Sequence, residues 1–218
     1  MPVTAAGLGC PMTVYGEYRT KEFSMDRTGG RIMAWWNVTR EGPSGLPTML
    51  TQTVVAAAAL CIGEIVSAPI YVGMASNRLA LVPWAMVACL LAVAFVYTVG
   101  FAVLWGVDNL TRRMSIRYRP VAYGVVGMIG FGCWGRFVVA AFLDSLLRPL
   151  GLTTLSAGSL LLITINSAVL GFAAWFLAYV SPKPLSDRRV TVAVIGVVTV
   201  LLAVAGAYYL SRMYAVLY

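Results

Sequence analysis

The sequence predicts an all-α integral membrane protein: a bundle of five transmembrane helices that follows a short irregular arm. Composition gives the first reason. Of the 218 residues 60% are hydrophobic and only 11% are charged, whereas a soluble domain carries about 25% charged residues. The second reason is that the apolar residues gather into five long stretches. Each exceeds the roughly 20 residues that a helix rising about 1.5 Å per residue needs to cross about 30 Å of hydrocarbon.

The five predicted spans divide the chain into a membrane domain and an arm. The spans are residues 51–73, 81–107, 121–143, 155–180 and 190–210. Pro69 inside the first span predicts a kink, and Pro83 predicts the first turn of the second. Residues 1–46 are expected to form a largely irregular cytoplasmic arm, and residues 47–218 the transmembrane domain, because five helices and their loops use most of this length.

The loops predict the orientation of the bundle. Basic residues concentrate in the connection after the second span and in the connection after the fourth. They are Arg112, Arg113, Arg117, Arg119, Lys183, Arg188 and Arg189. Short loops rich in Lys and Arg stay on the cytoplasmic side, so we expect a cytoplasmic N-terminus and an external C-terminus. The same residues are expected to contact anionic lipid headgroups, at about 1 kcal/mol each.

Composition also excludes several classes of function. The net charge of +8 comes from helix ends and short loops, so it predicts orientation in a membrane and no nucleic-acid partner. The chain has no histidine, and its four cysteines lack metal-type spacing, so we expect no metal site and no cofactor. Only two of the 16 cationic residues are lysine. This arginine bias indicates a high-GC genome, and we expect the cytoplasmic membrane of a bacterium.

Two ionisable residues lie inside predicted spans, where such side chains are costly and are candidates for function. They are Glu64 in the first span and Arg136 in the third. Counted from the cytoplasmic edges, they lie at about 17 Å and 23 Å, with Asn166 of the fourth span at about 20 Å. We therefore expect Glu64, Arg136 and Asn166 to converge. The group is either a clamp that fixes helix register or a site that binds a proton or cation, unless Glu64 or Arg136 faces a partner subunit.

Glycines mark one predicted helix as closely packed. The third span contains four that lie on or near one helix face: Gly124, Gly127, Gly132 and Gly135. Small residues let a second helix approach, so we expect tight packing within the bundle, with a hinge or a homo-oligomer contact as alternatives.

Sequence motifs favour a non-enzymatic role. The chain has no Walker A, GxSxG, HExxH or dinucleotide-binding motif. The leading hypothesis is an accessory or assembly component of a membrane complex, with a membrane protein or a second copy as partner. The alternative is a small transporter or channel subunit that uses Glu64 as its coupling or selectivity carboxylate. A lipid-modifying enzyme would need a water-accessible acid such as Asp108, Asp144 or Asp187.

Overall fold

The computed structural model describes residues 48–75, 80–111, 113–150, 155–181 and 188–217. Within these ranges there is no strand, and five helical segments are long and apolar enough to cross a membrane. The segments are Thr48–Met74, Leu81–Thr111, Arg119–Leu147, Ala157–Val180 and Arg189–Ala215. The predicted five-helix membrane bundle is confirmed, and the chain is a multi-pass membrane protein. The predicted arm lies outside the described residues.

Two of the five spans are interrupted by a π-helical turn. The elements in chain order are α1 (Thr48–Met74), α2 (Leu81–Phe95), η2 (Val96–Gly100), α3 (Phe101–Thr111), α4 (Arg119–Trp134), η3 (Gly135–Val139), α5 (Ala140–Leu147), the short 3₁₀ turn η4 (Arg148–Leu150), α6 (Ala157–Val180) and α8 (Arg189–Leu217). Thus α2, η2 and α3 form the second span, and α4, η3 and α5 form the third. A π turn changes the direction in which the following residues point, and hydropathy alone does not predict one.

The ends of several helices differ from the predicted spans. The second continues to Thr111, whose hydroxyl donates to the Val107 carbonyl oxygen at 2.8 Å. The fourth begins at Ala157, two residues later than predicted, because Ser156 caps it by accepting from the Ser159 N–H at 3.1 Å. Hydropathy marks the part of a helix that suits hydrocarbon, whereas backbone hydrogen bonds and caps decide where the helix ends.

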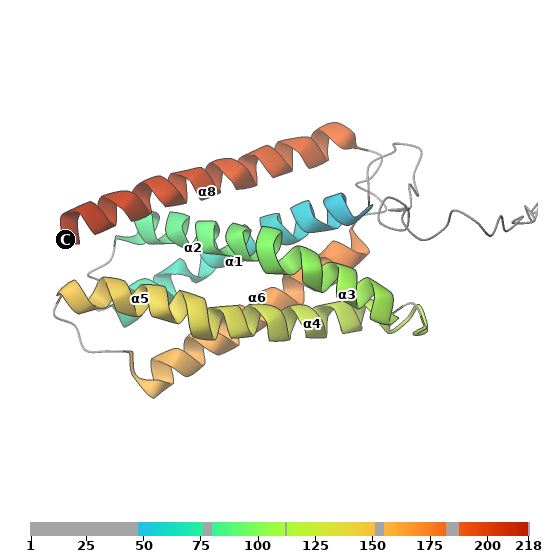
Figure 1. Cartoon of the computed structure of the whole chain (residues 1–218), viewed down its shortest axis with the longest axis horizontal. Helices are drawn as coiled ribbons and strands as arrows, with labels where there is room; N and C mark the ends of the chain where they lie inside the picture. Colours follow the sequence, from blue (N-terminus) through green and yellow to red (C-terminus); the bar gives the residue numbers. More distant parts are fainter. Residues whose placement is uncertain (1–47, 76–79, 112, 151–154, 182–187, 218) are drawn as a thin grey trace, which may run out of the picture. The chain divides into compact units, whose positions relative to one another are not determined.

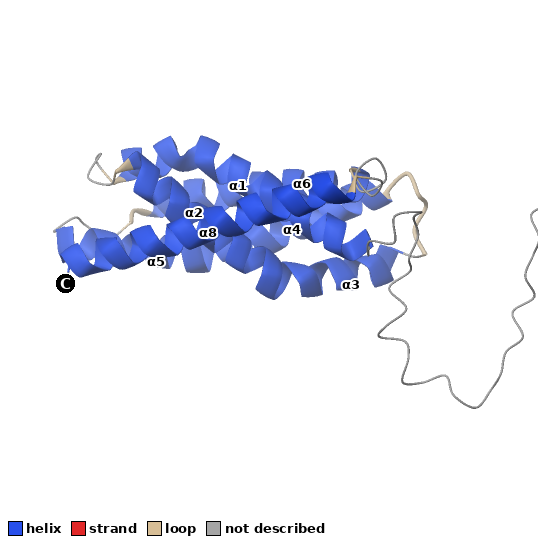
Figure 2. Cartoon of the chain, turned by 90° about the horizontal axis from the view of Figure 1, so that it is seen from above, coloured by secondary structure: helices blue, strands red, loops and turns tan. Residues whose placement is uncertain are grey.

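Helix α1 occupies the centre of the packing. It contacts α2, α6 and α8, and Figure 1 shows α8 running along α2 on one side of it while α4 and α6 lie on the other. Figure 2 shows the same helices after a quarter turn, all running along the long direction of the bundle. The two most extensive helix pairs are α4 with α6 and α2 with α8. The position of α1 between these pairs is what buries its polar residues.

An aromatic cluster fills the core beside the π turns. The ring of Phe95, the last residue of α2, lies 5.1 Å from Phe131, 5.4 Å from Trp134 and 5.5 Å from Trp175 between centroids. The four rings come from three different spans, and tilted pairs at this separation are favourable beyond their burial. The cluster holds the second, third and fourth spans together.

Glycines allow α4 and α6 to pack closely. A β-carbon on Gly127 would lie 2.5 Å from the Gly171 carbonyl oxygen and 2.6 Å from the Trp175 β-carbon. Gly124 lies against Phe172 in the same way. Further along the interface Gly132 faces Ala168 and Gly135 faces Ser167. All four predicted packing glycines therefore lie against α6, inside the bundle.

Candidate functional site

Glu64 is buried near the middle of α1, with 1% of the residue exposed. It lies 16 residues after Thr48 and 10 residues before Met74, or about 24 Å and 15 Å along the helix. This places the carboxyl deep within a hydrocarbon core that is about 30 Å thick. Ser67 and Tyr71 follow Glu64 by three and seven residues, so all three side chains lie on one face of α1.

Asn166 of α6 connects that face of α1 to the next helix. Its Oδ1 accepts a hydrogen bond from the Ser67 hydroxyl at 3.1 Å, and its Nδ2 donates to the Tyr71 hydroxyl at 3.0 Å. Ser167, the next residue of α6, is fully buried near Tyr71 and against Gly135 of η3. We call this group the α1–α6 polar cluster; its members are Glu64, Ser67, Tyr71, Asn166 and Ser167.

Within this cluster the Ser167 hydroxyl and the Glu64 carboxyl lack hydrogen-bond partners among the described residues, and the carboxyl is the acidic group of the two. Neither of its oxygens has a hydrogen-bond partner among the described residues. The Tyr71 hydroxyl lies beside it without forming a hydrogen bond of good geometry. No cation in the described part of the chain pairs with it either. An isolated buried carboxylate costs so much desolvation energy that such groups take up a proton or a counter-ion.

Two cysteine thiols lie close to the same carboxyl. Cys61 precedes Glu64 by one turn of α1, and its carbonyl oxygen accepts a weak hydrogen bond from the Cys89 thiol of α2 at 3.7 Å. Both cysteines are buried and free. The surroundings of Glu64 on the α2 side are therefore apolar and thiol-lined, without a charge.

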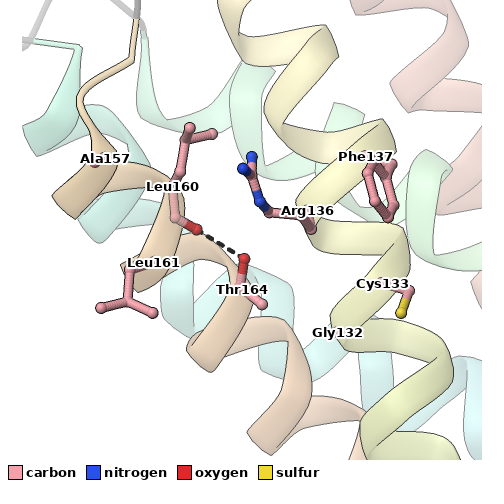
Figure 3. A pocket seen from close by; sticks show the side chains of 8 residues that line it. All are labelled: Gly132, Cys133, Arg136, Phe137, Ala157, Leu160, Leu161 and Thr164. Carbon is pink, nitrogen blue, oxygen red and sulfur yellow. Dashed lines mark hydrogen bonds between the residues drawn. The ribbon is translucent and has the colours of Figure 1, made fainter.

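The structure does not bring Arg136 to Glu64. Arg136 belongs to η3, is exposed, and forms no ion pair within the described residues. Its side chain extends toward α6 into a pocket of about 400 Å³ (Figure 3). The pocket is lined by Gly132, Cys133, Arg136, Phe137, Ala157, Leu160, Leu161 and Thr164. Neither Glu64 nor Asn166 borders it, so the expected convergence of three residues reduces to Asn166 with the α1 face.

Arg136 and Glu64 lie apart because of how the helices pack and rotate. A count of residues along each helix gives depth and does not include rotation. Gly135 faces Ser167 on α6, and consecutive residues of a helix point in different directions. Arg136, the next residue, points into its pocket beside α6, and its span packs mainly on α6 and not on α1. The rotation of each helix is set by packing, here by the contact of Gly135 with Ser167.

Three members of the α1–α6 polar cluster were not predicted from the sequence as site residues. Ser67, Tyr71 and Ser167 carry no charge, so the cost of ionisable side chains in lipid does not single them out. A signal was available: Glu64, Ser67 and Tyr71 have the i, i+3, i+7 spacing of a single helix face. Their contact with Asn166 could not be read from sequence.

The described basic residues that were predicted to contact lipid headgroups lie in connections and at helix ends. Arg113 and Arg117 are exposed in the connection between α3 and α4, and Arg188 and Arg189 are exposed at the start of α8. Arg119 is partly buried and donates from Nε to the Met114 carbonyl oxygen at 3.2 Å. Arg112 and Lys183 lie outside the described residues.

Two of the candidate acids have partners within the bundle. Asp144 of α5 forms an ion pair at 2.8 Å with Arg148, four residues later at the start of η4. Asp108 accepts from the Tyr123 hydroxyl at 3.3 Å. Asp187 lies outside the described residues. Both described acids are partly buried.

No family model, curated protein or solved structure matches this chain.

The described residues hold no group of three or more His, Cys, Asp or Glu side chains that could bind a metal ion. Around Glu64 the neighbouring polar groups are neutral hydroxyls and an amide, and Asn166 already uses its oxygen and nitrogen on α1. A cation needs several oxygen ligands, whereas a proton needs one carboxyl. The arrangement suits the reversible binding of a proton.

Proposed function

We propose that this protein is a small proton-linked membrane transporter, or a subunit of one, in which Glu64 binds and releases the transported or coupling proton. The observation that carries the proposal is the buried Glu64 carboxyl, near the middle of a membrane span, without a hydrogen bond or counter-charge among the described residues. Carboxyl groups in such positions mark proton relays in pumps and transporters.

The neighbouring groups support this role. Tyr71 already accepts a hydrogen bond from Asn166, so its own O–H remains available to donate. When Glu64 loses its proton, a small movement would let the Tyr71 hydroxyl donate to the carboxylate and stabilise it. The Ser67–Asn166–Tyr71 hydrogen bonds hold that hydroxyl in place. In the arrangement described here the site is closed to solvent, so exchange of the proton requires α1 to move relative to α6 or α2.

A second candidate is an accessory or assembly component of a membrane complex. It is favoured by the hydrogen bonds that Asn166 makes to α1, because interhelical polar contacts of this kind fix helix register and contribute about 0.5–2 kcal/mol. In this case Glu64 would be a structural residue that carries a permanent proton. The clamp explains Asn166, Ser67 and Tyr71 but gives no reason for an acid at position 64.

Proton flux into proteoliposomes separates the two candidates. The purified protein would be reconstituted, and an internal pH indicator would follow flux under an imposed pH gradient. We expect flux above that of empty vesicles for the wild type and for Asp144→Asn, which removes a carboxylate that is already paired with Arg148. We expect none for Glu64→Gln. Equal flux from wild type and Glu64→Gln, or no flux above empty vesicles from either, would contradict the proposal.

Solvent access to position 64 gives a second test that does not depend on a known substrate. Glu64→Cys, in a chain with its other cysteines replaced, would be treated with an impermeant thiol reagent from each side of the membrane. We expect labelling from at least one side during an imposed proton gradient. Complete protection under all conditions, with the protein folded, would favour the accessory role.

We propose the cytoplasmic membrane of a bacterium, with the N-terminus in the cytoplasm and the C-terminus outside. This is supported by the arginines between α3 and α4 and at the start of α8, which lie at the same end of the bundle. Their exposed side chains suit contact with anionic headgroups.

A further inference from the structure

We propose that the pocket around Arg136 binds one anionic phospholipid, with its phosphate against the Arg136 guanidinium and an acyl chain along the apolar lining. This site is separate from the Glu64 carboxyl. The proposal is carried by an exposed arginine inside a membrane span, next to a pocket that is otherwise apolar.

The position of the pocket along the bundle fits a lipid. Its α6 side runs from Ala157, the first residue of the helix, to Thr164, seven residues later, or about 10 Å at 1.5 Å per residue. One end therefore opens where α6 begins and headgroups lie, and the other reaches toward hydrocarbon. Figure 3 shows the Arg136 side chain extended across the pocket toward α6, beside Leu160. Long arginine side chains reach the interface from buried backbone positions in this way.

The charge of the pocket favours an anion. The hydroxyl of Thr164 donates to the Leu160 carbonyl oxygen at 2.8 Å, so it is occupied within its own helix. Arg136 is the charged member of the lining and has no ion pair among the described residues. A guanidinium binds phosphate oxygens in a forked geometry. An unpaired arginine facing lipid is costly, and a lipid phosphate is the anion that the membrane itself supplies there.

The shape of the pocket favours an acyl chain over a soluble anion. Its volume is about 400 Å³, and most of its lining is leucine, phenylalanine and small residues. Phe137 beside Arg136 is 72% exposed, so the pocket is open to the surrounding lipid. A free phosphate ion would use the guanidinium and leave this apolar surface bare, whereas a phospholipid covers both.

Counting of bound lipid by native mass spectrometry tests the proposal. The delipidated protein would be titrated with phosphatidylglycerol and, separately, with phosphatidylcholine carrying the same chains. We expect the wild type to bind one phosphatidylglycerol in preference to phosphatidylcholine. Arg136→Gln should weaken phosphatidylglycerol binding about fivefold, the factor given by about 1 kcal/mol per arginine near the membrane surface. Arg136→Lys should keep most of the preference.

Control variants separate the site from general charge effects. Arg212→Gln removes an exposed arginine near the end of α8 and should leave the preference unchanged. Cys133→Trp fills the apolar side of the pocket while keeping Arg136, and it should weaken binding of both lipids. Glu64→Gln should have no effect, which keeps this test distinct from that of the proposed function.

Three results would overturn the proposal. The first is equal phosphatidylglycerol binding by wild type and Arg136→Gln. The second is displacement of the bound lipid by millimolar inorganic phosphate, which would make the acyl chain irrelevant. The third is loss of an oligomer in Arg136→Gln with lipid binding unchanged, which would assign Arg136 to an acidic group of a protein partner.

Discussion

Tyr71 lies seven residues after Glu64 on the same face of α1, and its hydroxyl accepts a hydrogen bond from Asn166 at 3.0 Å. The tyrosine therefore stands between a buried carboxyl with no hydrogen bond and an amide that fixes the tyrosine in place. Since the Tyr71 oxygen is already an acceptor, its proton is the group that it can offer to Glu64. This relationship makes the two residues a functional pair in the proposed mechanism and leads to the first prediction.

Replacing Tyr71 with phenylalanine should slow proton flux several-fold without abolishing it. The substitution removes the donor that would stabilise the ionised Glu64, while Glu64 itself remains able to bind a proton. Flux into proteoliposomes measures the effect, and Tyr97→Phe on the exposed side of η2 serves as the control. Unchanged flux in Tyr71→Phe would remove Tyr71 from the mechanism.

Infrared spectroscopy should reveal Glu64 as a neutral acid in the closed protein. The carbonyl stretch of a protonated carboxyl is separate from the bands of a carboxylate, and a buried carboxyl without a counter-charge favours the uncharged form. We expect the wild-type spectrum at neutral pH to contain such a band and the Glu64→Gln spectrum to lack it. Asp144→Asn, which removes a carboxyl held by Arg148, should retain it. Absence of the band in the wild type would show that another group neutralises Glu64.

Asn166→Ala should destabilise the bundle by about 1–2 kcal/mol. It removes two hydrogen bonds between α6 and α1, and interhelical polar contacts in membranes contribute about 0.6 kcal/mol on average, up to about 1.7. The free energy of unfolding in mixed micelles or bicelles measures the loss. Asn109→Ala is the matched control, because Asn109 is exposed and its amide donates to the Trp105 carbonyl oxygen of its own helix. Equal stability of the two variants would contradict the clamp.

Gly127→Ala should destabilise the protein by about 1–3 kcal/mol, the usual cost of overpacking a close contact. Its new β-carbon would meet the Gly171 carbonyl oxygen at 2.5 Å, and backbone cannot move aside as a flexible side chain can. Gly106→Ala is the control, since nothing lies within 4 Å of a β-carbon there. We expect Gly106→Ala to match or slightly exceed wild-type stability, measured in the same unfolding assay.

Single cysteines should establish the orientation of the bundle. In a chain without its native cysteines, we expect Ser115→Cys, in the exposed connection between α3 and α4, to be labelled by an impermeant reagent from the cytoplasmic side only. Ala215→Cys, exposed in the last turns of α8, should be labelled from the outside only. The reverse pattern would invert the topology, and the arginine-rich loops would then face outward.

The membrane class, the number of spans and the side chains that are costly in lipid could be predicted from the sequence. These follow from composition and hydropathy, because a helix must satisfy its backbone internally and present apolar side chains to hydrocarbon. Glu64 and Arg136 could be singled out on the same ground, and Asn166 by its similar depth.

Which of these residues meet depends on how the helices pack, and the sequence does not reveal it. Depth is set by position along the chain, but the direction of each side chain depends on the rotation of its helix, which close packing fixes at contacts such as Gly127 with Gly171. Packing placed Asn166 against Ser67 and Tyr71, left Glu64 buried without a hydrogen bond, and turned Arg136 outward to its own pocket. The sequence supplied the polar residues, and helix rotation separated them into two sites.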